Sequence, residues 1–327
     1  ALMIIGTLAL TGFPFLSGFY SKDAIIEFAY LKGNTTGYYA AGIGIVTAFL
    51  TSVYSWRLIF KTFHGEYNNK EISDVFKPFK HETTISNGSV SEKRLIDAIS
   101  DSLNQNFNLH NNLVIMGQDI AEYGGVFKIT EGFVDLFGKD RVRNTPICES
   151  SIIEIAMGLS ICNRKSIVEL QFSDFITSGF NPVVNYLAKS HYRWGQNADI
   201  VLRMPCGAGV GAGPFHSQTN EAWFTKTPGL IVVYPSTPID AKGLLISSVE
   251  NPNPVLFFEH KALYRSIRDD VPKGYYNLEI GKAKLLNVGT DITIITYGSG
   301  VHESIETIKK HSLSCLLYTS PSPRDRG

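Results

Sequence analysis

Residues 230–249, LIVVYPSTPIDAKGLLISSV, hold the pattern that decides the fold. The first five residues form an apolar, β-branched run, which is typical of a strand buried on both faces. A helix is predicted to start directly afterwards, because Thr237 can cap its first amide groups, Pro238 suits its first turn and Asp240 favours the positive end of its dipole. A buried strand followed at once by a helix indicates the repeating unit of an α/β domain.

The same alternation extends along much of the chain. Four other short apolar runs predict buried strands at residues 113–116, 166–172, 199–204 and 255–260. Apolar residues at helical spacing predict two further helices, through Leu95, Ile99 and Leu103 and through Ile152, Ile155, Ala156 and Leu159. We therefore predict a doubly wound α/β domain with a mostly parallel sheet from about residue 92 to residue 268.

The composition narrows the class of protein. Of the 327 residues, 44% are hydrophobic and 18% are charged, which is too apolar for a disordered chain. Thirty basic residues balance thirty acidic ones, so no net charge attracts nucleic acid, and nucleic acid is not expected as a partner. The four cysteines, at positions 148, 162, 206 and 315, form no CxxC pair. This spacing is typical of reduced thiols and predicts no metal site.

The N-terminal part of the chain differs in composition from the rest. Residues 1–21 and 34–56 contain no charged residue, so each stretch is long enough to cross a membrane as a helix. Pro14 predicts a kink or break in the first span. Basic and aromatic residues after the second span predict a cytoplasmic end there. We expect two transmembrane helices within residues 1–69, a membrane contact through residues 1–61, and a cytoplasmic domain after them.

The other domain boundaries follow from further changes in composition. Residues 70–91 are polar and punctuated by proline and glycine, as in a linker. Residues 269–312 carry two strand patterns and one helix pattern, which predict the truncated start of a second α/β domain. Residues 313–327 end in a proline-, serine- and arginine-rich run and are predicted to be a tail outside the fold. Because Ala1 is followed by no basic segment or cleavage site, we interpret the chain as a fragment.

Glu149 is a candidate for proton chemistry because it stands where a helix is predicted to begin. The simpler interpretation is a first-turn acid that complements the helix dipole. The alternative is a carboxyl held in an apolar pocket by Ile147 and Cys148, which would share a proton with a ligand nitrogen. The sequence alone favours the first interpretation. Burial favours the neutral carboxyl and the helix end favours the charged one, so the sequence does not decide the direction of the pKa shift.

A glycine run precedes a histidine in a predicted loop. Residues 207–213, GAGVGAG, partly match a dinucleotide-binding fingerprint, but Pro205 and Pro214 flank the run and no acidic residue follows at the required distance. A tight turn or a close backbone approach explains the glycines better. His216 follows among polar residues that can orient an imidazole, which fits either a structural hydrogen-bonding residue or a catalyst.

Three further residues allow two interpretations each. Phe175 can stack on a flat ligand ring or fill the core. Lys22 and Asp23, at the end of the first predicted span, form either a pair at the membrane edge or a buried proton relay. The sequence pattern alone favours the structural role for all three.

Long motifs, ordered along residues 92–312, resemble the beta subunits of thiamine-diphosphate-dependent 2-oxo acid dehydrogenases of the pyruvate and branched-chain type. They are MGQDIAEYGGVFKITEGF, DRVRNTPICES, GAGVGAGPFHSQTNEAWF, PGLIVVYPSTPIDAKGLL and NPNPVLFFEHKALYR. Residues 75–84, VFKPFKHETT, resemble the join in forms that fuse alpha and beta parts. The resemblance implies a transketolase-like pyrimidine-binding domain, thiamine diphosphate as cofactor, and oxidative decarboxylation of a 2-oxo acid with acyl transfer to lipoamide. It also implies an alpha subunit and a lipoyl-bearing acyltransferase as partners, and a cytoplasmic location for this part.

The resemblance assigns a role to each candidate residue. Glu149 matches the glutamate that bonds a ring nitrogen of the aminopyrimidine and promotes loss of the thiazolium proton. Ile147, Gln171 and Phe175 match residues around the pyrimidine ring, and His216 matches the histidine that assists transfer to lipoamide. The motif that binds diphosphate and magnesium is absent, as it is from the family's beta subunits. The alpha partner is expected to supply it, and the chain alone is expected to be inactive.

The N-terminal residues resemble a different family. LTGFPFLSGFYSKDAIIE and VYSWRLIFKTFHGEY, within residues 1–69, are similar to an internal piece of chain 5 of respiratory NADH-quinone oxidoreductase. The resemblance implies that Lys22 and Asp23 match a lysine–acid pair in the proton path. The ending CLLYTSPSPRDRG resembles translated adapter sequence. We interpret the whole as a chimeric reading frame; the alternatives are a membrane-subunit fragment and a membrane-tethered, non-catalytic binding module.

Overall fold

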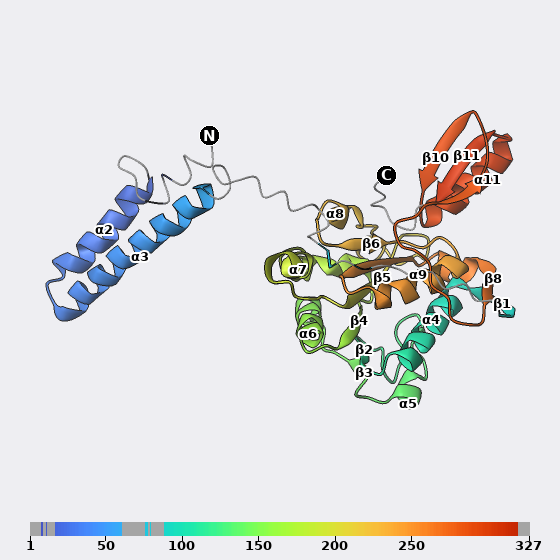
Figure 1. The fold of residues 1–327 in the computed structure, drawn as a ribbon, viewed down its shortest axis with the longest axis horizontal. Helices are drawn as coiled ribbons and strands as arrows, with labels where there is room; N and C mark the ends of the chain where they lie inside the picture. Colours follow the sequence, from blue (N-terminus) through green and yellow to red (C-terminus); the bar gives the residue numbers. More distant parts are fainter. Residues whose placement is uncertain are drawn as a thin grey trace. The chain divides into compact units, whose positions relative to one another are not determined.

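The computed structural model describes residues 17–60 and 88–319, together with Leu8, Thr11 and the residues at positions 76, 77 and 79. The chain divides into two compact units, Ala1–Lys70 and Glu71–Gly327. In the first unit, α2 (Ser17–Leu31) and α3 (Thr35–Ile59) pack side by side as a helical hairpin (Figure 1). Asn34 caps α3, because its side-chain oxygen accepts a hydrogen bond from the Gly37 amide at 2.8 Å.

The structure does not support two transmembrane helices. Apart from Leu8 and Thr11, residues 1–16 of the first predicted span lie outside the described residues, and the described helix α2 carries the charged Lys22 and Asp23. Those charges interrupt the apolar length that a membrane span requires. Within the described part of the chain, Thr35–Arg57 of α3 is the one stretch long and apolar enough to cross a membrane. A single such helix is weak support for membrane anchoring.

A six-stranded, all-parallel sheet forms the centre of the second unit, in the order β3-β2-β4-β5-β7-β6. The strands are β2 (Leu113–Gly117), β3 (Val142–Asn144), β4 (Lys165–Glu169), β5 (Ile200–Cys206), β6 (Ile231–Val233) and β7 (Val255–His260). The five apolar runs of the sequence all form strands of this sheet. The edge strand β3 was not predicted, because only three residues form it and two of them are exposed.

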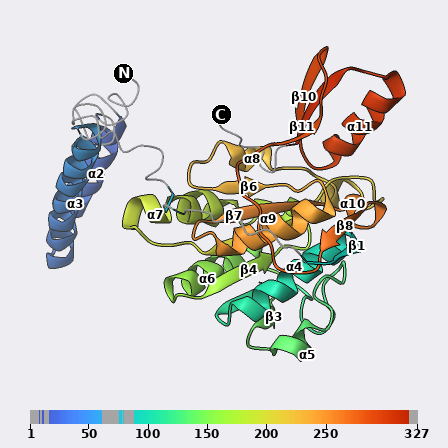
Figure 2. The same cartoon turned by 45° about the vertical axis from the view of Figure 1, so that its right-hand side comes forward.

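Helices cover both faces of the sheet, as a doubly wound domain requires (Figure 2). On one face, α4 (Leu95–Leu109) and α9 (Pro238–Glu250) pack on alternate strand residues such as Ile115 and Phe257. On the other face, α6 (Glu149–Ile161) and α7 (Ala188–Trp194) pack on the intervening residues, such as Met116 and Phe258. Because successive strand residues point to opposite faces, strands covered on both sides are apolar throughout. The predicted α/β fold is therefore confirmed.

The helix of the opening motif starts where its caps predict. The Thr237 hydroxyl accepts a hydrogen bond from the Asp240 amide at 3.2 Å, and Pro238 is the first residue of α9. Shorter helical segments connect the remaining strands. They are α5 (Phe133–Phe137), η3 (Ser173–Thr177), η4 (Pro182–Leu187), η5 (Pro214–His216), α8 (Ala222–Thr225) and α10 (Leu263–Ser266).

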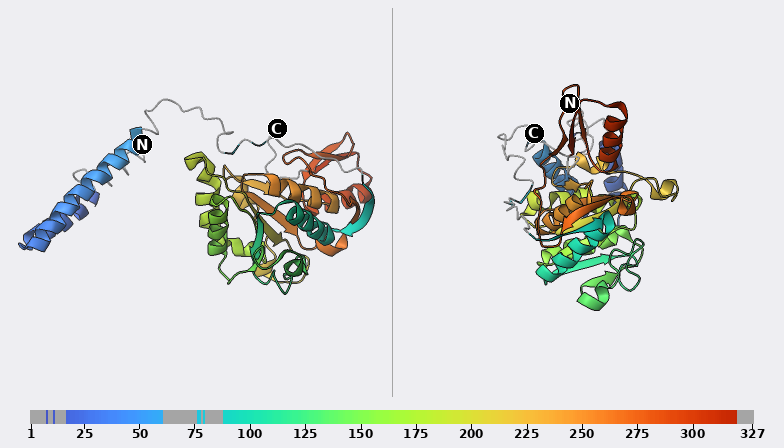
Figure 3. Two further views of the ribbon diagram at one scale, coloured as in Figure 1. Left: turned by 60° about the horizontal axis from the view of Figure 1, so that its bottom comes forward. Right: turned by 90° about the vertical axis from the view of Figure 1, so that its right-hand side faces the viewer.

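Two smaller sheets complete the second unit (Figure 3). One pairs β1 (Val90–Arg94) with β8 (Arg268–Pro272) in antiparallel register, a pairing that no sequence pattern predicted. The other has the order β10-β11-β9 and is accompanied by α11. Its elements are β9 (Lys284–Asn287), β10 (Ile292–Thr296), α11 (Ser299–His311) and β11 (Cys315–Thr319).

Strand β11 corrects the predicted start of the tail at residue 313. It lies between β9 and β10 and buries Cys315 and Leu317 completely, so the fold extends at least to Thr319. The physical reason is that CLLYT is an apolar strand sequence whose partners precede it in the chain. Residues 320–327 lie outside the described residues.

A buried charged cluster crosses the main sheet. Arg203 of β5 donates to Glu169 of β4 at 2.6 Å and, through two nitrogens, to Glu259 of β7 at 2.8 and 2.9 Å. The Tyr264 hydroxyl adds a bond to Glu259 at 2.6 Å. Burial raises the pKa of the Glu169 carboxyl, although the Arg203 charge opposes the shift. A buried arginine between two carboxylates ties three adjacent strands together, at the cost of removing all three charges from water.

Candidate functional site

The candidate site lies at the carboxyl ends of the parallel strands. Gln118 follows β2, Gln171 lies two residues beyond β4, Gly207 follows β5 and Lys261 follows β7. Because all strands of the sheet run in the same direction, these ends meet at one edge, where open α/β sheets bind their ligands.

Glu149 is the first residue of α6, and its side chain is buried, with 8% of its surface exposed. Its Oε1 accepts a hydrogen bond from the Gln118 amide at 3.1 Å, and its Oε2 accepts one from the Ser178 hydroxyl at 3.2 Å. Both partners are neutral. The carboxyl is thus held in one orientation, and neither partner supplies a neutralising cation.

His216 lies in a cluster of aromatic rings. Its ring centre is 4.6 Å from that of Phe172 and 5.5 Å from that of Phe175, in edge-on contacts. Glu149 is connected to this cluster, because the Ser178 hydroxyl that contacts its carboxylate also lies 3.0 Å from the Phe175 carbonyl oxygen. The structure therefore brings together Phe175 and His216, two residues that lie 41 positions apart in the sequence, and links Glu149 to them.

The glycine run forms the loop between β5 and His216. Gly207, Gly209, Gly211 and Gly213 all have positive φ, between +70° and +93°. A Cβ on Gly207 would lie only 2.2 Å from Nε2 of His260. The tight turns and close backbone approach expected from the sequence are both present, since only glycine adopts these conformations without strain.

Lys261 is the buried cation of this edge. Its ammonium donates to the Gly207 carbonyl at 2.7 Å and lies 5.4 Å from the centre of the Phe172 ring. Burial lowers the pKa of Lys261. Its positive charge thus lies beside the aromatic cluster that contains His216.

Four other predicted site residues lie outside the aromatic cluster around His216. Gln171 is at the same sheet edge and donates to the Asp119 carboxylate at 3.2 Å. Ile147 precedes α6, and its side chain is 83% exposed, so it packs against none of the buried clusters. Lys22 and Asp23 belong to α2 in the first unit. Their proposed proton relay stays a prediction.

A cavity of about 760 Å³ lies between α6 and the edge of the sheet formed by β2 and β3. Its lining includes Met116, Arg143, Cys148, Ile155 and Arg164. None of the predicted site residues lines it, so the cavity does not define the candidate site.

Sequence reasoning missed the residues that orient Glu149. Gln118 comes directly after the buried strand β2, and a polar residue at that position is a detectable signal. Ser178 follows η3 and carries no comparable signal. Its importance arises only because η3 brings its hydroxyl to the start of α6.

Comparison with known proteins identifies the domain. Residues 92–266 match the transketolase pyrimidine-binding domain family. The class of the protein is therefore that of the transketolase pyrimidine-binding domains. The fold also matches a solved split-gene transketolase, an inactive beta4 tetramer, with a TM-score of 0.56 over 72% of each chain. At 17% identity this match shows the fold alone.

Closer relatives define the family. The 2-oxoisovalerate dehydrogenase subunit beta of Bacillus subtilis is 42% identical over 224 residues, covering 67% of this chain and 68% of that protein. The pyruvate dehydrogenase E1 component subunit beta of Staphylococcus epidermidis is 39% identical, covering 68% and 69%. The mitochondrial 2-oxoisovalerate dehydrogenase subunit beta of Dictyostelium discoideum is 38% identical, covering 80% and 72%. The chain belongs to the family of beta subunits of 2-oxo acid dehydrogenases.

Proposed function

We propose that the second unit is the beta half of a thiamine-diphosphate-dependent enzyme that decarboxylates a 2-oxo acid and passes the acyl group to lipoamide. The observation that carries the proposal is the Glu149 carboxyl, buried at the start of α6 between two neutral partners. Identities of 38–42% to beta subunits named for pyruvate and 2-oxoisovalerate support the reaction class.

The residues at the sheet edge fit the pyrimidine half of the cofactor. A protein carboxyl that accepts only neutral hydrogen bonds is suited to hold or release a proton at a ring nitrogen. Phe175 offers an aromatic surface nearby. When bound, thiamine diphosphate supplies the carbon nucleophile and electron sink for decarboxylation. In this proposal Glu149 holds the proton that activates the cofactor, Phe175, Gln171 and Ile147 contact its pyrimidine ring, and His216 positions the lipoyl acceptor.

The diphosphate half of the cofactor is proposed to bind elsewhere. The described residues contain no group of three or more His, Cys, Asp or Glu side chains placed to hold a metal ion. We therefore assign diphosphate and magnesium binding to an alpha subunit, and acceptance of the acyl group to a lipoyl-bearing acyltransferase. Catalysis then requires the assembled complex.

Replacing Glu149 by glutamine tests the proposal directly. The chain is assembled with an alpha subunit from the same organism, and decarboxylation of pyruvate and of 2-oxoisovalerate is followed by reduction of an artificial electron acceptor. Glu149→Gln keeps the shape of the side chain but removes its exchangeable acidic proton. Decarboxylation should fall about 10²- to 10⁴-fold, the usual contribution of a positioned acid or base.

Glu154→Gln is the matched control, because Glu154 lies in the same helix and faces solvent. It should leave the decarboxylation rate within about twofold, since solvent-exposed changes away from a site have small effects. Full activity of Glu149→Gln, or an equal loss in both variants, would contradict the assigned role.

We propose separately that residues 1–69 come from a respiratory membrane subunit and that the chain is a chimeric reading frame. The proposal is supported by the division into two units at Lys70 and by the apolar length of Thr35–Arg57. In this proposal the first unit anchors the chain in a membrane, and Lys22 and Asp23 form a proton relay only within the parent subunit. Sequencing of independent genomic clones across codon 70 tests the origin. One uninterrupted gene would refute it.

A further inference from the structure

The loop that carries His216 is closed by hydrogen bonds at Gln218. The Gln218 carbonyl oxygen accepts from the Gly207 amide at 3.0 Å and from the Ser173 hydroxyl at 3.2 Å. The Gln218 amide donates to Oδ1 of Asp174 at 3.2 Å. Both backbone groups of Gln218 are therefore fixed, two residues after the histidine.

Two of these bonds come from one buried turn, η3. Ser173 is completely buried and Asp174 is 6% exposed. The contact is reinforced by Asn220, whose side-chain amide donates to the Ser173 carbonyl at 2.8 Å. A buried carboxylate that accepts a backbone amide forms a stronger hydrogen bond than a neutral acceptor would. The turn is thus a rigid support for the end of the loop.

The loop contains one short turn, η5, in which the His216 amide donates to the Gly213 carbonyl oxygen at 3.3 Å. Its four glycines at positions 207, 209, 211 and 213 adopt conformations with positive φ and carry no side chains that could pack. The segment between Gly207 and His216 therefore depends on its attachment points. Gln218, two residues after the histidine, attaches the end of the loop through its backbone.

The same turn also positions the ring that His216 contacts. Phe175 follows Asp174 directly in η3, and its ring centre is 5.5 Å from that of His216. One short helical turn thus holds the aromatic ring through its own backbone and the histidine through Gln218. A shift of Asp174 would alter the position of His216 relative to Phe175.

We propose that Asp174 is a positioning residue that sets the place of His216 for transfer of the acyl group to the lipoyl arm. This inference rests on the proposed function for the role of His216, but the hold of Asp174 on the loop is independent of it. In this proposal Asp174 acts through the Gln218 amide.

Two variants and one control test the proposal in the complex assembled with the alpha subunit. Asp174→Ala removes the acceptor, whereas Asp174→Asn keeps an oxygen that can accept from Gln218. The control is Asp199→Ala, which removes a part-buried aspartate that pairs with Lys165 at the opposite end of the strands. Three quantities are measured: acyl transfer to a lipoylated domain, decarboxylation with an artificial acceptor, and hydrogen exchange of the peptide covering residues 214–222.

In Asp174→Ala, transfer to the lipoylated domain should fall about 10- to 100-fold, far more than decarboxylation, as expected when a misplaced group affects one step. Exchange of the Gln218 amide should accelerate at least tenfold, because its acceptor is lost. Asp174→Asn should recover both to within about threefold. Asp199→Ala should affect neither the transfer step nor this peptide.

Unchanged exchange at Gln218 in Asp174→Ala would overturn the proposal. So would an equal loss of both activities, or failure of Asp174→Asn to recover transfer. Absence of any 2-oxo acid decarboxylation in the unmodified complex would refute the proposed function instead. The exchange measurement would still decide whether Asp174 holds the loop.

Discussion

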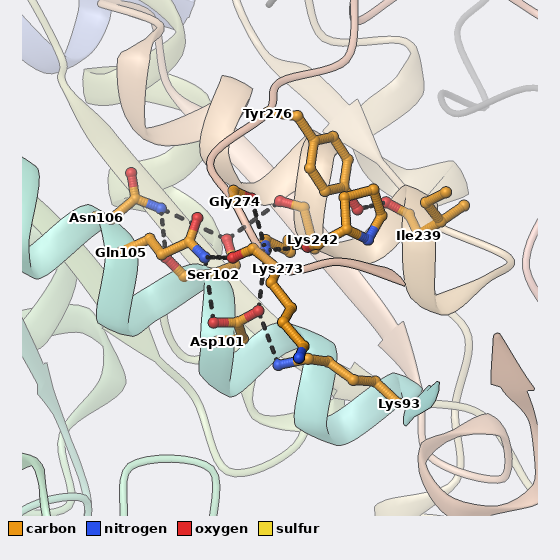
Figure 4. Close-up of polar contacts among 11 residues, drawn as sticks. Lys93, Asp101, Ser102, Gln105, Asn106, Ile239, Lys242, Lys273, Gly274 and Tyr276 are labelled. Carbon is orange, nitrogen blue, oxygen red and sulfur yellow. Dashed lines mark hydrogen bonds and ion pairs between the residues drawn. The ribbon is translucent and has the colours of Figure 1, made fainter. Parts of the chain in front are cut away.

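Lys242 provides the sharpest test of how buried charge stabilises this fold. It lies on α9 with its side chain fully buried, and its ammonium donates to Asp101 of α4 at 2.9 Å (Figure 4). It also donates to the carbonyl oxygens of Pro272 and Gly274, at 2.7 and 2.9 Å. One cation thus ties two helices to the segment that follows β8. We choose Lys242→Met as the perturbation, because the methionine side chain is unbranched and fills most of the volume of the lysine side chain.

The expected loss in the free energy of unfolding follows from the partners that Lys242→Met leaves without a donor. Breaking a fully buried ion pair costs about 3–5 kcal/mol, and a buried carbonyl that loses its donor costs about 1–3 kcal/mol, so these figures are upper bounds for the part-buried bonds of Lys242. Two effects reduce the sum. Asp101 keeps a second cation, Lys93, at 2.9 Å. Burial also lowers the pKa of Lys242, which means that burial disfavours its charged form. The methionine variant does not have to bury that charge. We expect a net loss of about 3 kcal/mol in the free energy of unfolding.

Differential scanning calorimetry of Lys242→Met should then show a fall in Tm of about 6–12 °C, at about 2–4 °C for each kcal/mol. Lys93→Met is the matched control, since Lys93 pairs with the same Asp101 oxygen but keeps 23% of its side chain exposed. A partly solvated pair contributes below about 1 kcal/mol, so its Tm should fall by less than about 4 °C. Equal shifts in the two variants would refute the argument from burial.

Three further outcomes are expected. In thermal unfolding, Gly207→Ala should lower the Tm more than Gly211→Ala. Both glycines have positive φ, but only a Cβ at position 207 would lie against His260. Equal shifts in Tm would exclude that clash. Iodoacetamide should label Cys148 well before Cys206, as followed by mass spectrometry. Hydrogen bonds with Ser151 lower the pKa of the exposed Cys148 thiol, whereas burial raises the pKa of the Cys206 thiol to about 12. Burial lowers the pKa of His260 below its ordinary 6.5, so the folded state binds fewer protons than the unfolded state just below that pH. Stability should therefore fall as the pH drops below about 6.5, and urea titrations of His260→Gln should show a shallower fall; an unchanged slope would contradict the assignment.

The strands and helices of the main sheet were predictable because their signals are local. Apolar runs recur because each central strand is covered on both faces, and Thr237 and Pro238 mark the start of α9 through contacts within one turn. The same locality placed Glu149 at a helix start. The family motifs then identified Glu149, Phe175 and His216 as candidates before any distance between them was known.

Sequence patterns failed where the partner of a residue lies far along the chain. The strand β1 pairs with β8, about 180 positions away, and β11 was mistaken for a tail because both of its partners precede it.

The amino-acid sequence by itself determined the α/β class, the positions of the main strands along the chain and the candidate residues, because burial and capping depend on near neighbours. Only the tertiary structure decided what surrounds those residues. Gln118 and Ser178 meet the Glu149 carboxylate from two different connections of the sheet, and Asp174 reaches Gln218 across 44 positions. Such contacts form because the carboxyl ends of parallel strands lie at the same edge of the sheet. The spacing of residues along the chain does not show which of the loops meet at that edge.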